Sequence, residues 1–179
     1  MEKIKLEMPV TEDEIRELNV GDKIALSGVL YTARDAAHAR LVDALEAGEE
    51  LPMELEGQGI YYVGPCPAKP GQVIGSAGPT TSYRMDPFAP YLLKEGLRVM
   101  IGKGERSTEV IETMKEEGAV YLGAIGGAAA LIAKCIKQAE VIAYDDLGTE
   151  AVRRLEVEEL PLICVIDSAG NNLYHRAGE

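Results

Sequence analysis

Short apolar segments alternate with segments of helical periodicity along nearly the whole chain of 179 residues. The apolar segments predict buried strands, and the amphipathic segments between them predict helices. The predicted strands are residues 3–10, 23–31, 59–64, 72–77, 97–102, 119–124, 140–144 and 160–167. The predicted helices are residues 11–18, 35–47, 107–117 and 128–138, with a helical stretch over residues 80–94 that is interrupted by Pro87 and Pro90. This alternation is typical of an α/β layered domain, although it does not give the order of the strands.

Four helix starts are predicted from polar residues that precede an apolar pattern. Thr11 and Glu14 have the spacing of a capping box, and Ser107 is placed to cap the helix that ends before Gly118. Thr32 or Asp35 is expected to cap the second helix, and Thr80 or Thr81 the third.

Length and composition favour one packed domain over residues 1–179, with residues 1–20 as an N-terminal strand and helix arm. Hydrophobic residues make up 46% of the chain and charged residues 27%, which is ordinary for a globular protein. No apolar run approaches the length of a transmembrane helix, and the first residues lack the core of a signal peptide. We therefore expect a cytoplasmic protein.

The charge of the chain limits its partners. With 30 acidic and 18 basic side chains the net charge is -12, so nucleic acids and anionic membranes are not expected to bind. Residues 27–104 hold 9 acids and 7 bases, whereas residues 105–179 hold 14 acids and 7 bases. An anionic ligand would meet the least repulsion in this middle part.

The cysteines and histidines make a weak case for a metal site. Cys66, Cys135 and Cys164 are scattered and form no Cys-x-x-Cys pair, which favours a reducing compartment. Cys135 and Cys164 lie inside a predicted helix and strand, as small core residues do. His38 and His175 are isolated from one another in sequence. We expect no metal and no cofactor to be held by this chain alone.

Three segments place a cation where a Gly-rich strand end meets a helix start. They contain Arg34, Arg84 and Lys103, within residues 27–35, 75–86 and 100–104. Free N–H groups at a helix start favour carboxylate or phosphate, and added cations strengthen such a site. Arg suits a planar carboxylate because its fork contacts both oxygens, whereas Lys acts as a point charge.

Each segment also has a simpler structural explanation. Arg34 beside Asp35 is equally compatible with a surface ion pair, and residues 102–104, Gly-Lys-Gly, are typical of an exposed turn. They do not form a phosphate-binding P-loop, because the pattern Gly-x-x-x-x-Gly-Lys-Ser/Thr is absent and Glu105 follows Gly104. Tyr61 and Tyr62 are expected to point one inward and one outward. The density of Gly, Pro, hydroxyl and Arg residues in 75–86 favours a functional role there.

Together these residues resemble a known family. Ser27-Gly28 and residues 31–38, 62–65, 75–86 and 101–104 are similar to the β subunit of class I (iron–sulfur) fumarate hydratase, and the L-tartrate dehydratase β subunit shares these motifs. The most specific part is Gly-Pro-Thr-Thr-Ser-Tyr-Arg-Met-Asp at residues 78–86. The resemblance extends from about Val20 to Leu173.

The resemblance implies a fold, a partner and roles for individual residues. The fold would be a three-layer β/β/α swivelling domain, and a [4Fe-4S] cluster would belong to a separate α subunit. Arg34, Arg84 and Lys103 would hold the substrate carboxylates, and Thr80 would be the candidate catalytic base. Asp35 and Thr81 would orient the site. An α2β2 assembly or contacts between β subunits are also expected.

The resulting hypothesis is a subunit of a hydro-lyase that interconverts fumarate and L-malate. Dehydration of L-tartrate is the alternative within the same class of reaction. An alternative of another class is a non-catalytic module that binds anions or nucleotides with the same helix starts, and a subunit with a role only in assembly is a third.

Overall fold

The structure, a computed structural model, describes residues 3–125 and 129–176. One mixed sheet contains the strands β1 (Ile4–Glu7), β2 (Lys23–Thr32), β3 (Gly59–Tyr61), β4 (Val99–Ile101), β5 (Val120–Ala124), β6 (Ile136–Ala143) and β7 (Val152–Ile166). The helices are α1 (Glu12–Arg16), α2 (Asp35–Glu46), α3 (Ala89–Lys94), α4 (Thr108–Glu117), α5 (Ala129–Cys135) and α6 (Leu173–Arg176), with the 3-10 turns η1 (Ser82–Met85) and η2 (Asp145–Glu150).

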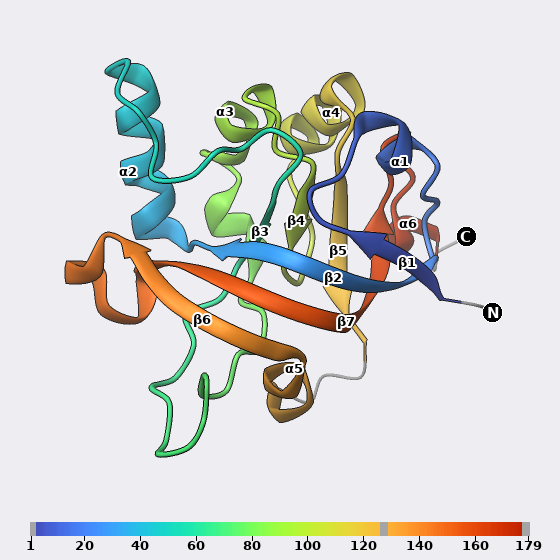
Figure 1. The fold of residues 1–179 in the computed structure, drawn as a ribbon. Helices are drawn as coiled ribbons and strands as arrows, with labels where there is room; N and C mark the ends of the chain where they lie inside the picture. Colours follow the sequence, from blue (N-terminus) through green and yellow to red (C-terminus); the bar gives the residue numbers. More distant parts are fainter. Residues whose placement is uncertain (1–2, 126–128, 177–179) are drawn as a thin grey trace.

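The long strand β7 closes the sheet on itself. Strands β1 to β5 are parallel to their neighbours in the order β1-β2-β3-β4-β5, and β7 runs antiparallel to both β5 and β2. Strands β2, β3, β4, β5 and β7 therefore form a hydrogen-bonded ring. Strand β6 extends it by pairing with the first half of β7. In Figure 1, β2, β7 and β6 cross below α2, α3 and α4, and β5 runs from the level of these helices down toward β7.

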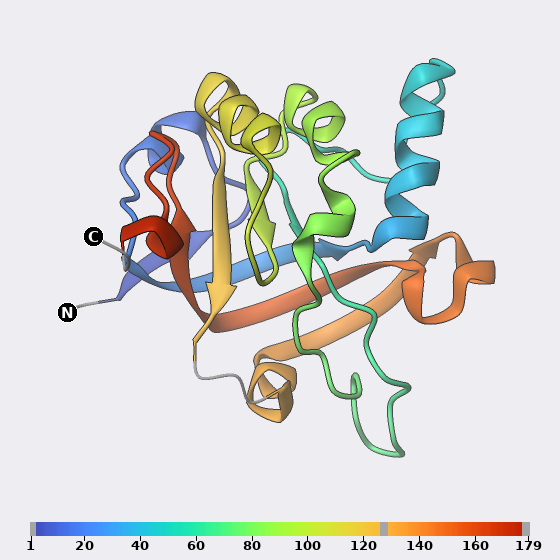
Figure 2. The ribbon, with the colours of Figure 1, turned by 180° about the vertical axis from the view of Figure 1, so that it is seen from behind.

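Side chains of β3, β4 and β5 alternate between two hydrophobic cores. Tyr61 and Ile101 belong to one core, together with Leu30 and Leu162 of the crossing strands. Their neighbours along the strands belong to the other core, which they share with Leu41, Leu92 and Met114 of the helices. Since a strand points successive side chains to opposite faces, both faces of these strands are buried. Helices α2, α3 and α4 cover one face, as Figure 2 also shows.

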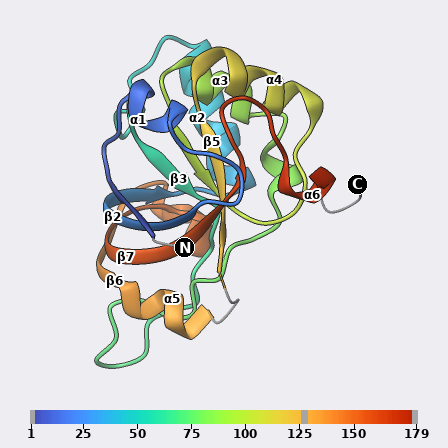
Figure 3. The same cartoon turned by 90° about the vertical axis from the view of Figure 1, so that its right-hand side faces the viewer.

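The N-terminal residues are part of the same packing. Strand β1 pairs with the first half of β2, and Leu6, Met8 and Val10 are buried in the core that faces β7. Ile15 of α1 is fully buried in that core. Figure 3 shows α1 and the helices α3 and α4 at one end of the molecule, and α5 at the other.

Gly28 allows β2 to change partners partway along its length. The register with β7 shifts between Leu26 and Gly28, which marks a β-bulge, and φ of Gly28 is +109°. A Cβ atom at this position would lie 2.8 Å from the carbonyl oxygen of Met8. The backbone geometry within the strand therefore requires Gly28. The sequence analysis had placed Gly28 at a strand end, and this was wrong.

Most predicted elements are confirmed. The errors occur in segments whose secondary structure depends on pairing with distant strands. Residues 72–77 form no strand, residues 136–138 belong to β6 and not to a helix, and β7 begins at Val152, eight residues before the predicted start. Tyr61 and Tyr62 do point to opposite faces, but both are buried because each face has its own core.

Two of the four predicted caps are confirmed. The capping box of Thr11 and Glu14 is present, and Ser107 Oγ accepts a hydrogen bond from the backbone of Val110. The N-cap of α2 is Arg34, which makes no side-chain cap bond, so neither Thr32 nor Asp35 caps this helix. Thr81 precedes η1 without a capping hydrogen bond.

None of the described helices has the length and apolar character needed to span a bilayer.

The bulge at Gly28 leads to a prediction. Gly28→Ala combines a positive φ with a clash against Met8, whereas Gly48→Ala has a similar positive φ of +71° and open space around it. We expect Gly48→Ala to lower the free energy of unfolding by about 1 kcal/mol and Gly28→Ala by roughly 2–4 kcal/mol. Urea unfolding of both variants measures the difference. Equal losses would show that β2 moves away from Met8 at no cost.

Candidate functional site

The candidate residues lie where parallel strands end. The carbonyl of Tyr61 accepts from Ala33 N at 3.2 Å, and the carbonyl of Tyr62 accepts from Thr80 N at 2.8 Å. Lys103 N donates to Thr80 O at 3.3 Å, and Ser82 N donates to Lys103 O at 2.9 Å. The segments that follow β3 and β4 are thus joined to residues 80–82, and the segment that follows β2 is joined to the end of β3. Carboxyl ends of parallel strands are where α/β proteins commonly bind ligands.

Thr80, Thr81 and Lys103 are brought together by backbone pairing. Thr81 and Lys103 form a parallel β-bridge, and both threonines are partly buried while Lys103 is exposed. Gly102 makes this approach possible, because a Cβ atom there would overlap the hydroxyl of Ser82 and the ring of Tyr62. Gly102 therefore has a steric role in holding residues 80–82 beside Lys103.

Arg84 lies on η1, the turn that follows these threonines, and it is exposed. A hydrogen bond with Tyr83, and then the charges of Tyr83, Asp35 and Glu150, hold the pKa of Arg84 above its ordinary value. Asp35 begins α2, so the start of α2 interacts electrostatically with Arg84.

Arg34 and Asp35 form a widely spaced ion pair at the start of α2. Arg34 Nε lies 3.9 Å from Asp35 Oδ1, which is too long for a hydrogen bond. Both atoms are buried and have no hydrogen-bond partner within the described part of the chain. The Arg34 side chain lies against Gly64, where a Cβ atom would come within 3.1 Å of it. An unpaired buried guanidinium nitrogen is costly and gains from an added acceptor.

The structure therefore groups the predicted residues into two sets. Thr80, Thr81 and Lys103 form one set through backbone bonds, with Arg84 on the next turn. Arg34 and Asp35 form the other, connected to Arg84 through the charge of Asp35. That the three cationic groups converge on one substrate stays a prediction.

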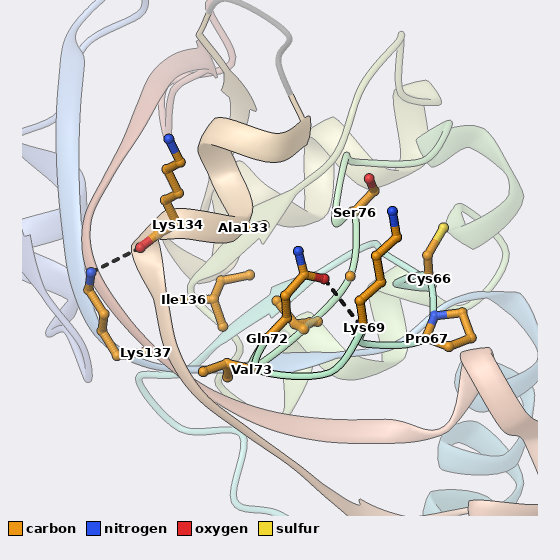
Figure 4. Close-up of a pocket in the computed structure, with 12 residues that line it drawn as sticks. Cys66, Pro67, Lys69, Gln72, Val73, Ser76, Ala133, Lys134, Ile136 and Lys137 are labelled. Atoms are coloured by element: carbon orange, nitrogen blue, oxygen red, sulfur yellow. Dashed lines mark hydrogen bonds between the residues drawn. The ribbon is translucent and has the colours of Figure 1, made fainter.

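Two cavities border this region. One of about 390 Å³ is lined by Lys103, Pro79 and Tyr174 among others, so it opens beside the candidate site. A second, of about 710 Å³, lies between the loop at residues 66–76 and α5, where Figure 4 shows Lys69, Lys134 and Lys137. None of the predicted site residues lines this second cavity. Of the predicted site residues, Lys103 lines the first cavity, so the candidate site adjoins that cavity through Lys103.

Beneath the candidate site lies a buried polar group that the sequence analysis missed. The side chain of Arg106 has no exposed surface, and its Nε donates to Asp86 Oδ1 at 2.7 Å. The sequence shows Asp86 at the end of the 75–86 segment, but nothing in it pairs Asp86 with an arginine 20 residues later. Arg106, between Glu105 and the cap Ser107, has the sequence setting of a surface residue.

The buried side chain of His38 holds the first turn of α2 in place. Its Nδ1 donates to the carbonyl oxygen of Arg34 at 2.8 Å, and its ring packs edge-on against Tyr62 with centroids 5.4 Å apart. Burial, aided by the positive charge of Arg106, lowers the pKa of His38 to about 4. His38 is therefore neutral at physiological pH and acts as a structural support for Arg34.

The described residues do not suit an iron–sulfur cluster. They contain no group of three or more His, Cys, Asp or Glu side chains that could hold a metal ion. Cys66 is exposed, Cys135 is partly buried on α5, and Cys164 is buried in the core beside β2. Burial raises the pKa of the Cys164 thiol well above its ordinary value, which disfavours the thiolate that binds iron.

The low pKa of His38 makes stability depend on pH. The folded state excludes a proton that the unfolded chain binds near pH 6.5, so stability falls as the pH drops from 6.5 toward 4. We expect His38→Gln to remove this dependence. The stability advantage of the unmutated protein over His38→Gln should shrink by about 2–3 kcal/mol between pH 7.5 and pH 4.5. Urea unfolding at both pH values tests this, and parallel pH profiles of the two proteins would contradict it.

Comparisons with known proteins agree with the sequence motifs. The family described as "Fumarase C-terminus" matches residues 1–177. "Fumarate hydratase 2" of Leishmania major is 39% identical over 97% of this chain and 31% of its own length, and "Fumarate hydratase class I, anaerobic" of Escherichia coli (strain K12) is 38% identical over 97% and 32%.

A further relative has nearly the length of this chain. The "Putative L(+)-tartrate dehydratase subunit beta" of Methanocaldococcus jannaschii is 39% identical over 95% of this chain and 90% of its own length. By contrast, the chain spans about a third of the fumarate hydratases that it matches. The match over residues 1–177 and these identities show that the chain belongs to the Fumarase C-terminus family.

Proposed function

We propose that this chain is the β subunit of a two-subunit iron–sulfur hydro-lyase that interconverts fumarate and L-malate. The observation that supports it most is the backbone pairing of Thr80 and Thr81 with Lys103 at the carboxyl end of β4, with Arg84 on the following turn. The fumarate hydratases similar to this chain align with it by about a third of their length, as a separate subunit would.

The proposed role of the cations is to hold a doubly charged substrate. Fumarate and malate each have two carboxylates, so a dry site must supply positive charge to offset the cost of desolvation. Arg34 and Arg84 suit this task because each can bind both oxygens of a carboxylate. The buried Arg34 Nε, which has no acceptor among the described residues, would gain one from the substrate.

Thr80 is the candidate base in this proposal. Removal of a proton from the carbon beside a carboxylate builds negative charge on that carboxylate, and fixed cations stabilise it. A threonine hydroxyl is a weak base unless neighbouring cations lower its pKa. Lys103, paired through the backbone with Thr80 and Thr81, is the nearest candidate for that effect.

The cluster and the remaining subunit complete the proposed enzyme. Since the described residues offer no cluster ligands, we assign the [4Fe-4S] group to an α subunit, where it would supply a Lewis acid for the departing hydroxyl. This chain would then bind and orient the substrate and remove the proton. We also propose that the two cores on either side of β3–β5 reflect a three-layer β/β/α swivelling domain.

Dehydration of L-tartrate is the second candidate. The relative that this chain covers to 90% of its length is named for that activity, whereas the fumarate hydratases are covered to about a third. L-malate and L-tartrate are small hydroxy dicarboxylates, and fumarate is the dehydration product of malate. The same cations would therefore hold all three. Assays of fumarate, L-malate and L-tartrate with one preparation of the complex separate the two.

Arg84 tests the carboxylate-binding role. Arg84→Ala should lower kcat/KM for fumarate hydration by at least ~10²-fold in the complex with the α subunit, because a charge-assisted contact in a desolvated site contributes about 3 kcal/mol. Arg16→Ala is the matched control, since Arg16 is also an exposed arginine but pairs with Glu12 on α1. Full activity of Arg84→Ala would eliminate this residue from the site.

Thr80 tests the assignment of the base. Thr80→Val keeps the branched shape and the backbone bond to Tyr62 but removes the hydroxyl, so kcat should fall by at least ~10²-fold with little change in KM. Thr80→Ser keeps the hydroxyl and should retain most of the activity. The same loss of kcat in both variants would point to a packing role for Thr80 instead.

A further inference from the structure

The buried arginine Arg106 lies directly under the segments that form the candidate site. It follows Lys103 by three residues, and its carboxylate partner Asp86 follows Arg84 by two. The second oxygen of Asp86 accepts from the backbone of Ser107 at 2.8 Å, so both carboxylate oxygens are engaged. One ion pair therefore joins the end of η1 to the loop between β4 and α4.

The guanidinium of Arg106 is also held between two aromatic rings. Its carbon Cζ lies 5.2 Å from the ring centroid of Tyr62 and 4.8 Å from that of Tyr121. Its Nη2 donates to the Tyr62 hydroxyl at 3.1 Å. Tyr62 directly follows β3 and its carbonyl oxygen accepts from Thr80 N, and Tyr121 belongs to β5. Arg106 thus contacts β5 and the residues that directly follow β3 and η1.

The hydroxyl of Tyr121 extends this contact to the loop that holds Lys103. It donates to the carbonyl oxygen of Gly104 at 2.8 Å. Because a phenol has a single proton, the bond of 2.7 Å between Ser82 Oγ and Tyr121 Oη must have Ser82 as its donor. Ser82 follows Thr81, and Gly104 follows Lys103. The Tyr121 hydroxyl therefore bridges the segment that contains Ser82 and the segment that contains Gly104, and so fixes the distance between them.

We infer that Arg106 and Tyr121 are positioning residues that set the spacing between the Thr80–Arg84 segment and Lys103. Neither belongs to the proposed substrate-binding set; Arg106 bonds Asp86 and Tyr62, and Tyr121 bonds Ser82 and Gly104, which are neighbours of that set in the chain. The inference therefore rests on the function proposed above. A buried ion pair is weak evidence for stability, because its desolvation cost offsets the attraction, but its geometry is highly specific. Small displacements of reacting groups reduce rates strongly.

A matched pair of arginine variants tests this role. Arg106→Lys keeps the charge but loses the planar contacts with Asp86 and the two rings. Arg98→Lys is the control, because Arg98 is likewise buried, with 11% of its side chain exposed, and bonds Gly118 O at 3.0 Å at the opposite end of β4. We expect both variants to lower the melting temperature, and Arg106→Lys alone to lower kcat/KM, by about 10-fold or more and mainly through kcat.

A second pair removes single hydroxyl groups. Tyr121→Phe keeps the ring over Arg106 but loses the bonds to Ser82 and Gly104, and we expect it to lower kcat about 3- to 10-fold. Thr113→Val is its control, since the buried Thr113 hydroxyl bonds only Glu109 O within α4. This pair keeps the inference testable if Arg106→Lys fails to fold.

Amide hydrogen exchange of this chain gives a readout that does not depend on activity. The amides of Ser82 and Lys103 bond across the two segments, so their exchange should accelerate in Arg106→Lys and Tyr121→Phe and not in the controls. An unmutated complex without hydro-lyase activity on any dicarboxylate would refute the proposed function, and exchange would then decide the positioning role. Unchanged exchange in Tyr121→Phe, or unchanged kcat in both site variants of an active complex, would overturn the inference.

Discussion

The antiparallel pairing of β7 with both β2 and β5 is the interaction on which the rest of the structure depends. It closes β2, β3, β4, β5 and β7 into a ring and gives the short strands β3 and β4 neighbours on both sides. A strand of three residues cannot hold its position alone, but two faces buried in separate cores fix it. The carboxyl ends of these strands are thereby fixed in position, and they support the loops that contain Thr80 and Lys103.

The candidate site is built on this base in two layers. The upper layer is a series of backbone hydrogen bonds that connects the ends of β3 and β4 to residues 80–82, and the segment that follows β2 to the end of β3. The lower layer is polar and buried, with Arg106, Asp86 and the hydroxyls of Tyr62 and Tyr121. His38 adds a third support, because its bond to the Arg34 carbonyl holds the start of α2. The exposed side chains of Arg84 and Lys103 thus lie above buried, hydrogen-bonded groups.

Local sequence signals predicted the elements that depend on local interactions. The capping box of Thr11 and Glu14, the cap Ser107 and the length of α2 all follow from contacts within a few residues, and all are confirmed. The start of β7 at Val152 was missed because its alternating pattern is short and rich in charges, and residues 136–138 were missed because they continue a helical pattern. Their conformation comes from pairing with β2 and with each other.

The sequence by itself determined the alternation of strands and helices, the acidic charge, and the segment 75–86 with Arg84 that identifies the family. Only the tertiary structure decided that Thr81 pairs with Lys103, that Asp86 belongs to Arg106, and that Gly28 serves a bulge. The physical reason is the separation along the sequence over which each kind of interaction acts. Capping and periodicity act over a few residues, whereas hydrogen bonds and ion pairs between residues 20 or more apart exist only after the sheet has closed.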